Sequence, residues 1–316
     1  MDVLVDYETV CVNCKEKGYS FGYTFKTIKY KNRTVMDIPT RYLNGPCIAF
    51  EYKEIPILIR SLENSHHLGV AQKTPLFTMI NAKRNNDSTI TRFTYLYSPQ
   101  YHPEVVKKKI QPERPDPRVL EYVDIYRYHD KPYILMFYSF RNSTHDPLRN
   151  FNFYQFYDFD INGEEGYKTD SAEYDEKLNI AFQYDAQEGK QLSPIVGIGT
   201  INDNIPTHFE CNAPQDLLIT PERLNLRDCN RKGPAECAVG LQWHIPSIGP
   251  GQMEVFPVMM VFGLGEEKFK ANVLEARAHL EKISPSIFNV VNGKFRQLID
   301  PELEKMSFSM REWCKD

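Results

Sequence analysis

The alternation of apolar and polar residues predicts that most of this chain forms β-strands. The clearest pattern covers residues 238–263, where two apolar stretches flank the turn residues Gly249-Pro250-Gly251. In the second stretch, large apolar side chains occupy both faces of the expected strand, with Phe256, Val258, Met260 and Phe262 on one face and Val255, Met259 and Val261 on the other. A strand that is apolar on both faces belongs in the middle of a packed structure. We therefore expect two buried strands here, joined as a hairpin.

The same alternation predicts further strands along the chain. A hairpin is expected around the turn Lys31-Asn32-Arg33, and residues 47–59 are expected to form two strands, with Pro56 marking a sheet edge or a bend. The other expected strands are 89–97, 119–128, 131–142, 151–160, 178–184, 195–201 and 208–211. This pattern is typical of a mainly β protein, a large two-layer antiparallel sandwich.

After residue 265 the apolar period changes from two to between three and four. The residues on this helical stripe are Phe269, Val273, Ala276, Leu280 and Ile283, so a C-terminal helix is expected. We predict a sandwich over 1–265, with a helix and tail over 266–316 packed on it. Residues 214–237 are expected to be a loop with a helical turn near Thr220–Leu226, and 103–118 a long surface connection. Whether 61–118 form a separate lobe stays open.

Charge and composition exclude some functions. The 38 basic and 42 acidic residues give a net charge of −4, which argues against nucleic acid or an anionic membrane as a partner held by bulk charge. No apolar run is long enough to cross a membrane, and the first residues lack the pattern of a signal peptide. Seven cysteines, an odd number, are typical of reduced thiols, so a cytoplasmic location is expected.

A series of motifs in the second half of the chain resembles a known family. They are Phe156-Tyr-Asp-Phe-Asp-Ile-Asn-Gly163, Tyr174-Asp175, residues 180–184, Ala238-Val-Gly-Leu-Gln-Trp243 and Ile248-Gly-Pro-Gly251, followed by Val261-Phe-Gly263 and a helix that begins with acidic residues. This order resembles the N-terminal β super-sandwich of glucoamylase-like and glycogen-debranching-type glycoside hydrolases, which has the galactose mutarotase-like fold. The resemblance covers roughly residues 120–282 and implies a carbohydrate context.

In the enzymes of that family the catalytic carboxylates lie in a later (α/α)₆ barrel, for which this sequence has no matching positions. We therefore assign no catalytic residue, and the first hypothesis is a non-catalytic protein that binds a glycan or a glycosidase-type catalytic partner. The alternative is a sugar-modifying enzyme of the aldose-epimerase type, which requires His145, His208 or His244 to face an acid in a concave pocket. A structural subunit without a ligand is a third hypothesis. The oligomeric state stays open.

Two motifs suit metal ions, and each has a simpler interpretation. Asp158-x-Asp160-x-Asn162-Gly163 matches the first half of a calcium loop, but a strand end followed by an Asn-Gly turn explains the same residues. Cys11 and Cys14 have the spacing of half a zinc site and lack a second pair. We favour the simpler interpretations, and no metal or cofactor is expected.

Aromatic residues are the remaining candidates for sugar binding. Trp243, Tyr154, Tyr157 and Phe159 lie among apolar neighbours, so they are expected to be buried. Tyr126, Tyr128 and Tyr138 have polar neighbours and are expected to be partly exposed. These three are the predicted carbohydrate-binding residues.

Overall fold

A computed structural model describes residues 3–12, 20–37, 44–60, 78–84, 90–97, 118–128, 130–163, 166–220 and 222–283. The contacts divide the chain into two units, Met1–Arg277 and Ala278–Asp316. The sheets lie in the first unit. The predicted domain boundary after residue 265 stays a prediction.

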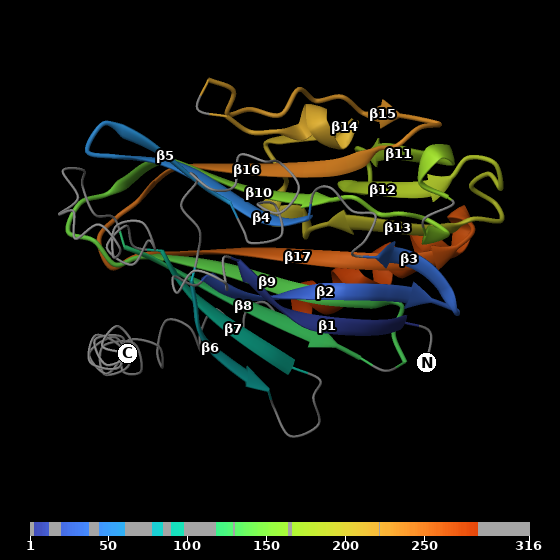
Figure 1. Cartoon of the computed structure of the whole chain (residues 1–316), viewed down its shortest axis with the longest axis horizontal. Helices are drawn as coiled ribbons and strands as arrows, with labels where there is room; N and C mark the ends of the chain where they lie inside the picture. Colours follow the sequence, from blue (N-terminus) through green and yellow to red (C-terminus); the bar gives the residue numbers. More distant parts are fainter. Residues whose placement is uncertain are drawn as a thin grey trace. The chain divides into compact units, whose positions relative to one another are not determined.

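The strands form three sheets (Figure 1). The three-stranded sheet has the order β1 (Val3–Val12), β2 (Ser20–Tyr30), β3 (Arg33–Asp37). The five-stranded sheet has the order β14 (His208–Asn212), β16 (Ala238–Ile248), β10 (Leu148–Tyr157), β4 (Asn44–Tyr52), β5 (Ile55–Arg60).

The nine-stranded sheet has the order β15 (Arg231–Lys232), β11 (Asp170–Asp175), β12 (Ile180–Asp185), β13 (Pro194–Gly199), β17 (Met253–Leu264), β9 (Tyr133–Asn142), β8 (Val119–Arg127), β7 (Ile90–Tyr97), β6 (Thr78–Arg84). Neighbouring strands in all three sheets are antiparallel. The predicted fold class, a mainly β antiparallel sandwich with a C-terminal helix, is confirmed.

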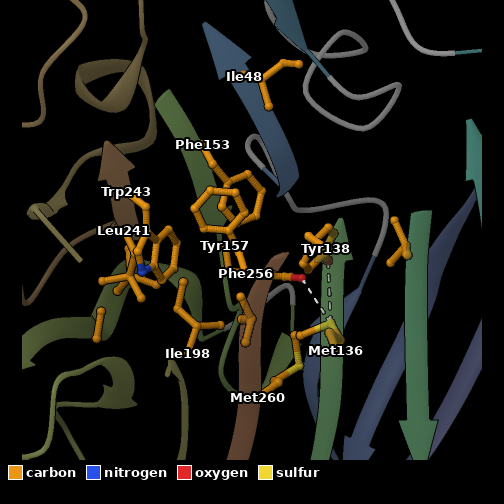
Figure 2. Packing of buried hydrophobic residues seen from close by; sticks show 14 of the residues in the cluster. Ile48, Met136, Tyr138, Phe153, Tyr157, Ile198, Leu241, Trp243, Phe256 and Met260 are labelled. Carbon is orange, nitrogen blue, oxygen red and sulfur yellow. Dashed lines mark hydrogen bonds between the residues drawn. The ribbon is translucent and has the colours of Figure 1, made fainter. Parts of the chain in front are cut away.

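The core lies between the five-stranded and nine-stranded sheets, whose inner faces meet through aromatic side chains (Figure 2). Phe153 of β10 packs on Phe256 of β17, with 4.8 Å between ring centroids, and on Trp243 of β16, at 5.3 Å. Burial of one such side chain stabilises a fold by about 1.5–3 kcal/mol. The three-stranded sheet contributes to the same core, since Tyr30 stacks on Phe262.

The two strands predicted over 238–263 exist, but the prediction that they pair as a hairpin is wrong. β16 lies between β14 and β10 in the five-stranded sheet, whereas β17 lies between β13 and β9 in the nine-stranded sheet. The turn at Gly249-Pro250-Gly251 thus carries the chain from one layer to the other. Both strands have apolar inner faces, and these faces can bury each other only across the sandwich.

The residues on the predicted helical stripe do form a helix, at 266–283. In the first unit, the helix contacts the outer face of the nine-stranded sheet, where Phe269 packs on Phe182 with 5.3 Å between ring centroids. Glycine is needed at Gly263, because a Cβ there would come within 2.4 Å of the Phe269 Cα. Asn272 Nδ2 also donates a hydrogen bond to the Phe262 carbonyl at 2.7 Å.

Two other local predictions can be compared with the structure. Pro56 lies in β5, at an edge of the five-stranded sheet, as predicted. The helical turn expected near Thr220–Leu226 is wrong: a 3₁₀ turn forms earlier, at Pro214–Leu217, where Pro214 can begin a turn because it needs no N–H partner. Residues 103–117 and the tail 286–316 lie outside the described residues.

Candidate functional site

The outer face of the five-stranded sheet, on the side away from the core, carries a group of polar side chains. Leu241 and Trp243 of β16 point into the core, so the alternating residues Gln242 and His244 point outward. Strand register places His208 of β14 and Tyr154 of β10 opposite Gln242, and Asn152 opposite His244. We call Asn152, His208, Gln242 and His244, together with Asn225 and Asp228 of the adjoining loop, the polar face.

Part of the same outer face is covered by the loop that follows β14. Leu217, Ile219 and Leu226 of this loop pack on apolar side chains of β4, β10 and β16, which are Cys47, Ala49, Tyr154, Phe156 and Ala238. The Tyr154 hydroxyl, which is fully buried, donates a hydrogen bond of 2.6 Å to the Leu224 carbonyl. The loop is therefore fixed to the sheet, and its residues Asn225 and Asp228 have fixed positions beside the strands.

A buried carboxylate anchors the same loop. Glu210 of β14 is fully buried, and its Oε1 accepts a hydrogen bond of 2.7 Å from Arg227 Nε. Its Oε2 accepts one of 3.0 Å from the Arg227 backbone N–H. A buried carboxylate that loses its hydrogen-bond donors is costly, even though the Arg227 side chain itself reaches solvent. Glu210 therefore has a structural role, which is to hold Arg227 and the residues on either side of it.

Gln242 is the centre of the polar face and is fully buried. Its Nε2 donates to Asn152 Oδ1 and to Asn225 Oδ1, both at 2.9 Å. Its Oε1 accepts a hydrogen bond of 2.9 Å from the Leu226 N–H. We call Gln242, Asn152 and Asn225 the amide cluster. All hydrogen-bonding atoms of the Gln242 side chain are satisfied, which makes the cluster rigid.

The two histidines of the polar face each contact a polar partner through Nδ1. His208 Nδ1 lies 2.9 Å from Asp228 Oδ2, and Asp228 Oδ1 accepts a hydrogen bond of 3.1 Å from the Phe209 N–H. His244 is exposed, and its Nδ1 lies 3.2 Å from Asn152 Oδ1. Both imidazoles lie on the same face of adjacent strands as diagonal neighbours, a relation that typically separates residues by about 7–8 Å.

The predicted tyrosines do not form one binding surface. Tyr138 is only 4% exposed and lies in the core, where its ring packs on Phe153 and its hydroxyl contacts the Met136 sulfur (Figure 2). The expectation that Tyr138 is partly exposed is therefore wrong, because its position in β9 points toward the facing sheet. Tyr126 and Tyr128 are partly exposed, and Tyr126 packs on Phe137 with 5.6 Å between ring centroids.

Tyr126 belongs to the outer face of the nine-stranded sheet, since Val123 and Ile125 of the same strand point into the core. It therefore lies on the opposite side of the sandwich from the polar face. Carbohydrate binding at Tyr126 and Tyr128 stays a prediction. Trp243, Tyr154, Tyr157 and Phe159 are all buried, as predicted.

The segment that matches a calcium loop forms a strand end and a turn. Gly163 N–H donates to the Asp160 carbonyl at 2.9 Å, and Asn162 has a φ of 68°. Within the described residues, no group of three or more His, Cys, Asp or Glu side chains is placed to hold a metal ion. The Cys11 and Cys14 side chains lie outside the described part. Cys47, Cys211, Cys229 and Cys237 are free thiols.

Buried aspartates surround this turn, and we call Asp158, Asp160, Asp170 and Asp185 the carboxylate group. Asp170 is 1% exposed, its Oδ2 accepts a hydrogen bond of 3.0 Å from the Ile161 N–H, and its Oδ1 has no hydrogen-bond partner in the described structure. Burial raises the pKa of Asp170 to about 9; the Ile161 hydrogen bond lowers it, and the carboxylates of Asp160, Asp185 and Asp158 raise it. Asp170 is therefore protonated at neutral pH.

In the described residues, no helix has both the length and the apolar character needed to cross a bilayer. No known protein-family model and no curated protein matches the sequence.

The fold is similar to several solved structures at low sequence identity. A bacterial glucoamylase complexed with acarbose is 10% identical, with a TM-score of 0.47, over 87% of this chain and 38% of the glucoamylase chain. This chain therefore spans well under half the length of that enzyme. A putative aldose 1-epimerase from Escherichia coli K12 is 7% identical, with a TM-score of 0.41, over 82% of this chain and 100% of the other. A galactose mutarotase-like protein from Lactobacillus casei is 9% identical, with a TM-score of 0.40, over 81% and 100%.

Sequence reasoning named His145, His208 and His244 as candidates but missed the residues that organise the last two. Asn152 and His244 are separated by 92 residues, and His208 and Asp228 by 20, so the strand register alone brings them together. One signal was available: Gln242 and His244 are polar residues that alternate with the apolar Leu241, Trp243 and Ile245. That alternation marks an outer face with polar side chains.

Proposed function

We propose that this chain binds a carbohydrate on the polar face of the five-stranded sheet. The observation that carries the proposal is the amide cluster, in which Gln242 holds Asn152 and Asn225 beside two histidines of adjacent strands. Sugar hydroxyls both donate and accept hydrogen bonds, so they are matched by amide, carboxylate and imidazole groups held in fixed positions. The sequence resemblance to a glycoside-hydrolase sandwich supports the same class of ligand.

The test is a glycan array screen of the full chain, followed by calorimetric titration of the best glycan. The variant is the double substitution His208→Ala/His244→Ala. The control is His145→Ala, which removes an exposed histidine from the turn between β9 and β10. We expect the double variant to lose at least about tenfold in affinity, the equivalent of roughly one net hydrogen bond, while the control binds as the wild type does. An array without a binder, or equal affinity in the double variant, would overturn the proposal.

A second candidate is an aldose epimerase, and the His208–Asp228 contact favours it. Interconversion of anomers needs a group that donates a proton and one that accepts it. His208 Nδ1 lies 2.9 Å from a carboxylate oxygen, which is the first part of the condition set for this function; the second part is a concave pocket around the pair. The test is polarimetry of freshly dissolved aldoses with the wild type and His208→Gln. If the wild type accelerates mutarotation and His208→Gln does not, the epimerase function is supported. Equal rates of mutarotation with and without the protein would exclude this function for those sugars.

Binding to a glycosidase-type protein partner is the remaining form of the first hypothesis. A purified partner should then retain this chain on a column without added glycan. If the column still retains the His208→Ala/His244→Ala variant, the surface that binds the partner lies on another part of the chain.

A further inference from the structure

The hydrogen bonds around Gln242 determine which nitrogen of His244 carries the proton. An amide side chain can be turned by half a rotation without a change of shape, so its orientation has to be deduced from partners whose role is fixed. Two backbone groups supply such partners here. The Leu226 N–H can only donate, and the Asn150 carbonyl can only accept.

The Leu226 N–H determines the orientation of the Gln242 amide. The Leu226 N–H donates to Gln242 at 2.9 Å, so the receiving atom is the Gln242 oxygen and the other terminal atom is the nitrogen. That nitrogen donates to Asn152 at 2.9 Å, so the Asn152 atom that faces Gln242 is an oxygen.

The Asn150 carbonyl determines the orientation of the Asn152 amide, independently of Gln242. The Asn150 carbonyl accepts a hydrogen bond of 2.8 Å from Asn152, so the Asn152 atom at that contact is the nitrogen. Both lines give the same orientation, with Oδ1 of Asn152 facing Gln242 and His244. Asn152 is only 4% exposed, so water does not replace these partners.

An amide oxygen only accepts hydrogen bonds, and His244 Nδ1 lies 3.2 Å from it. We infer that neutral His244 is the Nδ1–H tautomer, that its Nε2 is an exposed acceptor, and that Asn152 and Gln242 are the positioning residues that set this state. The tautomer of a histidine is set by the hydrogen bond of its other ring nitrogen. His208 has the same arrangement, because Asp228 Oδ2 is also an acceptor.

The chemical consequence is a pair of imidazoles that each keep an unprotonated Nε2, whose lone pair can accept a hydrogen bond. Such a pair accepts hydrogen bonds from two ligand hydroxyls and discriminates against ligands that offer only acceptors. The role toward hydroxyls rests on the proposed carbohydrate function. The tautomer itself does not depend on any ligand.

The experiment is long-range ¹H–¹⁵N NMR of the histidine rings in the full chain without ligand, at a pH where the imidazoles are neutral. Protonated and unprotonated ring nitrogens have widely separated ¹⁵N shifts, so the tautomer is read directly. In the wild type we expect Nδ1 of His244 to be the protonated nitrogen. His145, exposed and without a ring hydrogen bond in the described structure, serves as the reference for an unrestrained ring. An Nε2–H tautomer at His244, or the same tautomer mixture as at His145, would overturn the inference.

Two variants of one residue then test the positioning role. Asn152→Asp keeps an acceptor toward His244, so the Nδ1–H tautomer should persist. Asn152→Leu removes the acceptor at similar size, so His244 should shift to the mixture seen at His145. Unchanged His244 shifts in Asn152→Leu would show that Asn152 has no such role. If Asn152→Leu does not fold, Asn152→Ala replaces it, since it also removes the acceptor that faces His244 Nδ1, and His244 should again show the mixture seen at His145. A correct tautomer together with a negative glycan array would refute the proposed function and leave this inference standing.

Discussion

Gln242 of the amide cluster and Asp170 of the carboxylate group are both buried, yet their hydrogen bonding differs. Every polar atom of the Gln242 side chain has a partner at 2.9 Å. Asp170, at 1% exposure, has one oxygen without a partner and three other carboxylates around it. Neutral amides can satisfy one another without net charge, whereas carboxylates at neutral pH can only repel one another or take up protons. The comparison indicates that the amide cluster stabilises the fold and orders the polar face. The carboxylate group instead lowers the free energy of unfolding as the pH rises.

The largest expected effect comes from breaking the amide cluster. Gln242→Leu removes three hydrogen bonds and leaves the Leu226 N–H and two amide oxygens without their partner. Each unsatisfied buried group costs about 1–3 kcal/mol, so we expect a loss of about 3 kcal/mol or more in the free energy of unfolding. Urea denaturation measures it. A loss under about 1 kcal/mol would show that water replaces these partners.

A smaller effect of opposite sign is expected in the carboxylate group. Asp170→Asn keeps the acceptor for the Ile161 N–H at nearly the same shape and removes the ionisable group. We expect the variant to be more stable than the wild type at pH 7, by roughly 1–3 kcal/mol, because the wild type must hold a proton that the unfolded chain releases. Thermal and urea denaturation at pH 7 measure this difference, and a less stable variant would contradict it.

The pH dependence of that difference gives a sharper test. The folded-state pKa of Asp170 is about 9, above the ordinary value of 3.8, so folding takes up a proton between those values. The stability associated with this group is fully present below about pH 4 and is lost as the pH rises toward 9, by at most about 1.4 kcal/mol per pH unit. The advantage of Asp170→Asn should therefore grow from pH 5 to pH 8. A difference that is constant with pH would show that Asp170 is not protonated in the folded protein.

The smallest effect on stability is expected at the exposed edge of the polar face. Asp228→Asn alters a partly exposed contact with His208, and Asn tolerates the φ of 54° at this position. Exposed ion pairs contribute about 0–1 kcal/mol, so the change in the free energy of unfolding should stay below that value. Glycan affinity measured in parallel should fall more than stability does. A stability loss comparable to that of Gln242→Leu would make Asp228 part of the structural cluster instead.

Much of the fold could be predicted from the sequence, because local patterns determine it. The alternation in residues 253–263 identified a strand buried on both faces, and the spacing from Phe269 identified the helix. Local patterns do not give strand partners, so β16 and β17 were expected to pair although they belong to opposite layers. β11 was missed because Asp170–Asp175 contains three acidic residues and little apolar alternation.

The polar face was harder to predict than the fold. His208 and His244 could be named as residues able to face an acid, but the acid itself, Asp228, lies in a loop with no periodic pattern. Asn152 and Gln242 carry no motif, since an amide becomes informative only when its hydrogen-bond partners are known. Tyr138 was misjudged because polar neighbours along the chain say little about which face of a strand a residue occupies.

We propose that carbohydrate binds at the polar face and not elsewhere on the sandwich. The most direct measurement is an NMR titration of the full chain with the best glycan from the array, following the ring resonances of His208, His244 and Tyr126. We predict saturable shifts at both histidines and none at Tyr126, which lies on the opposite side of the core. Shifts at Tyr126 with unchanged histidines would contradict it.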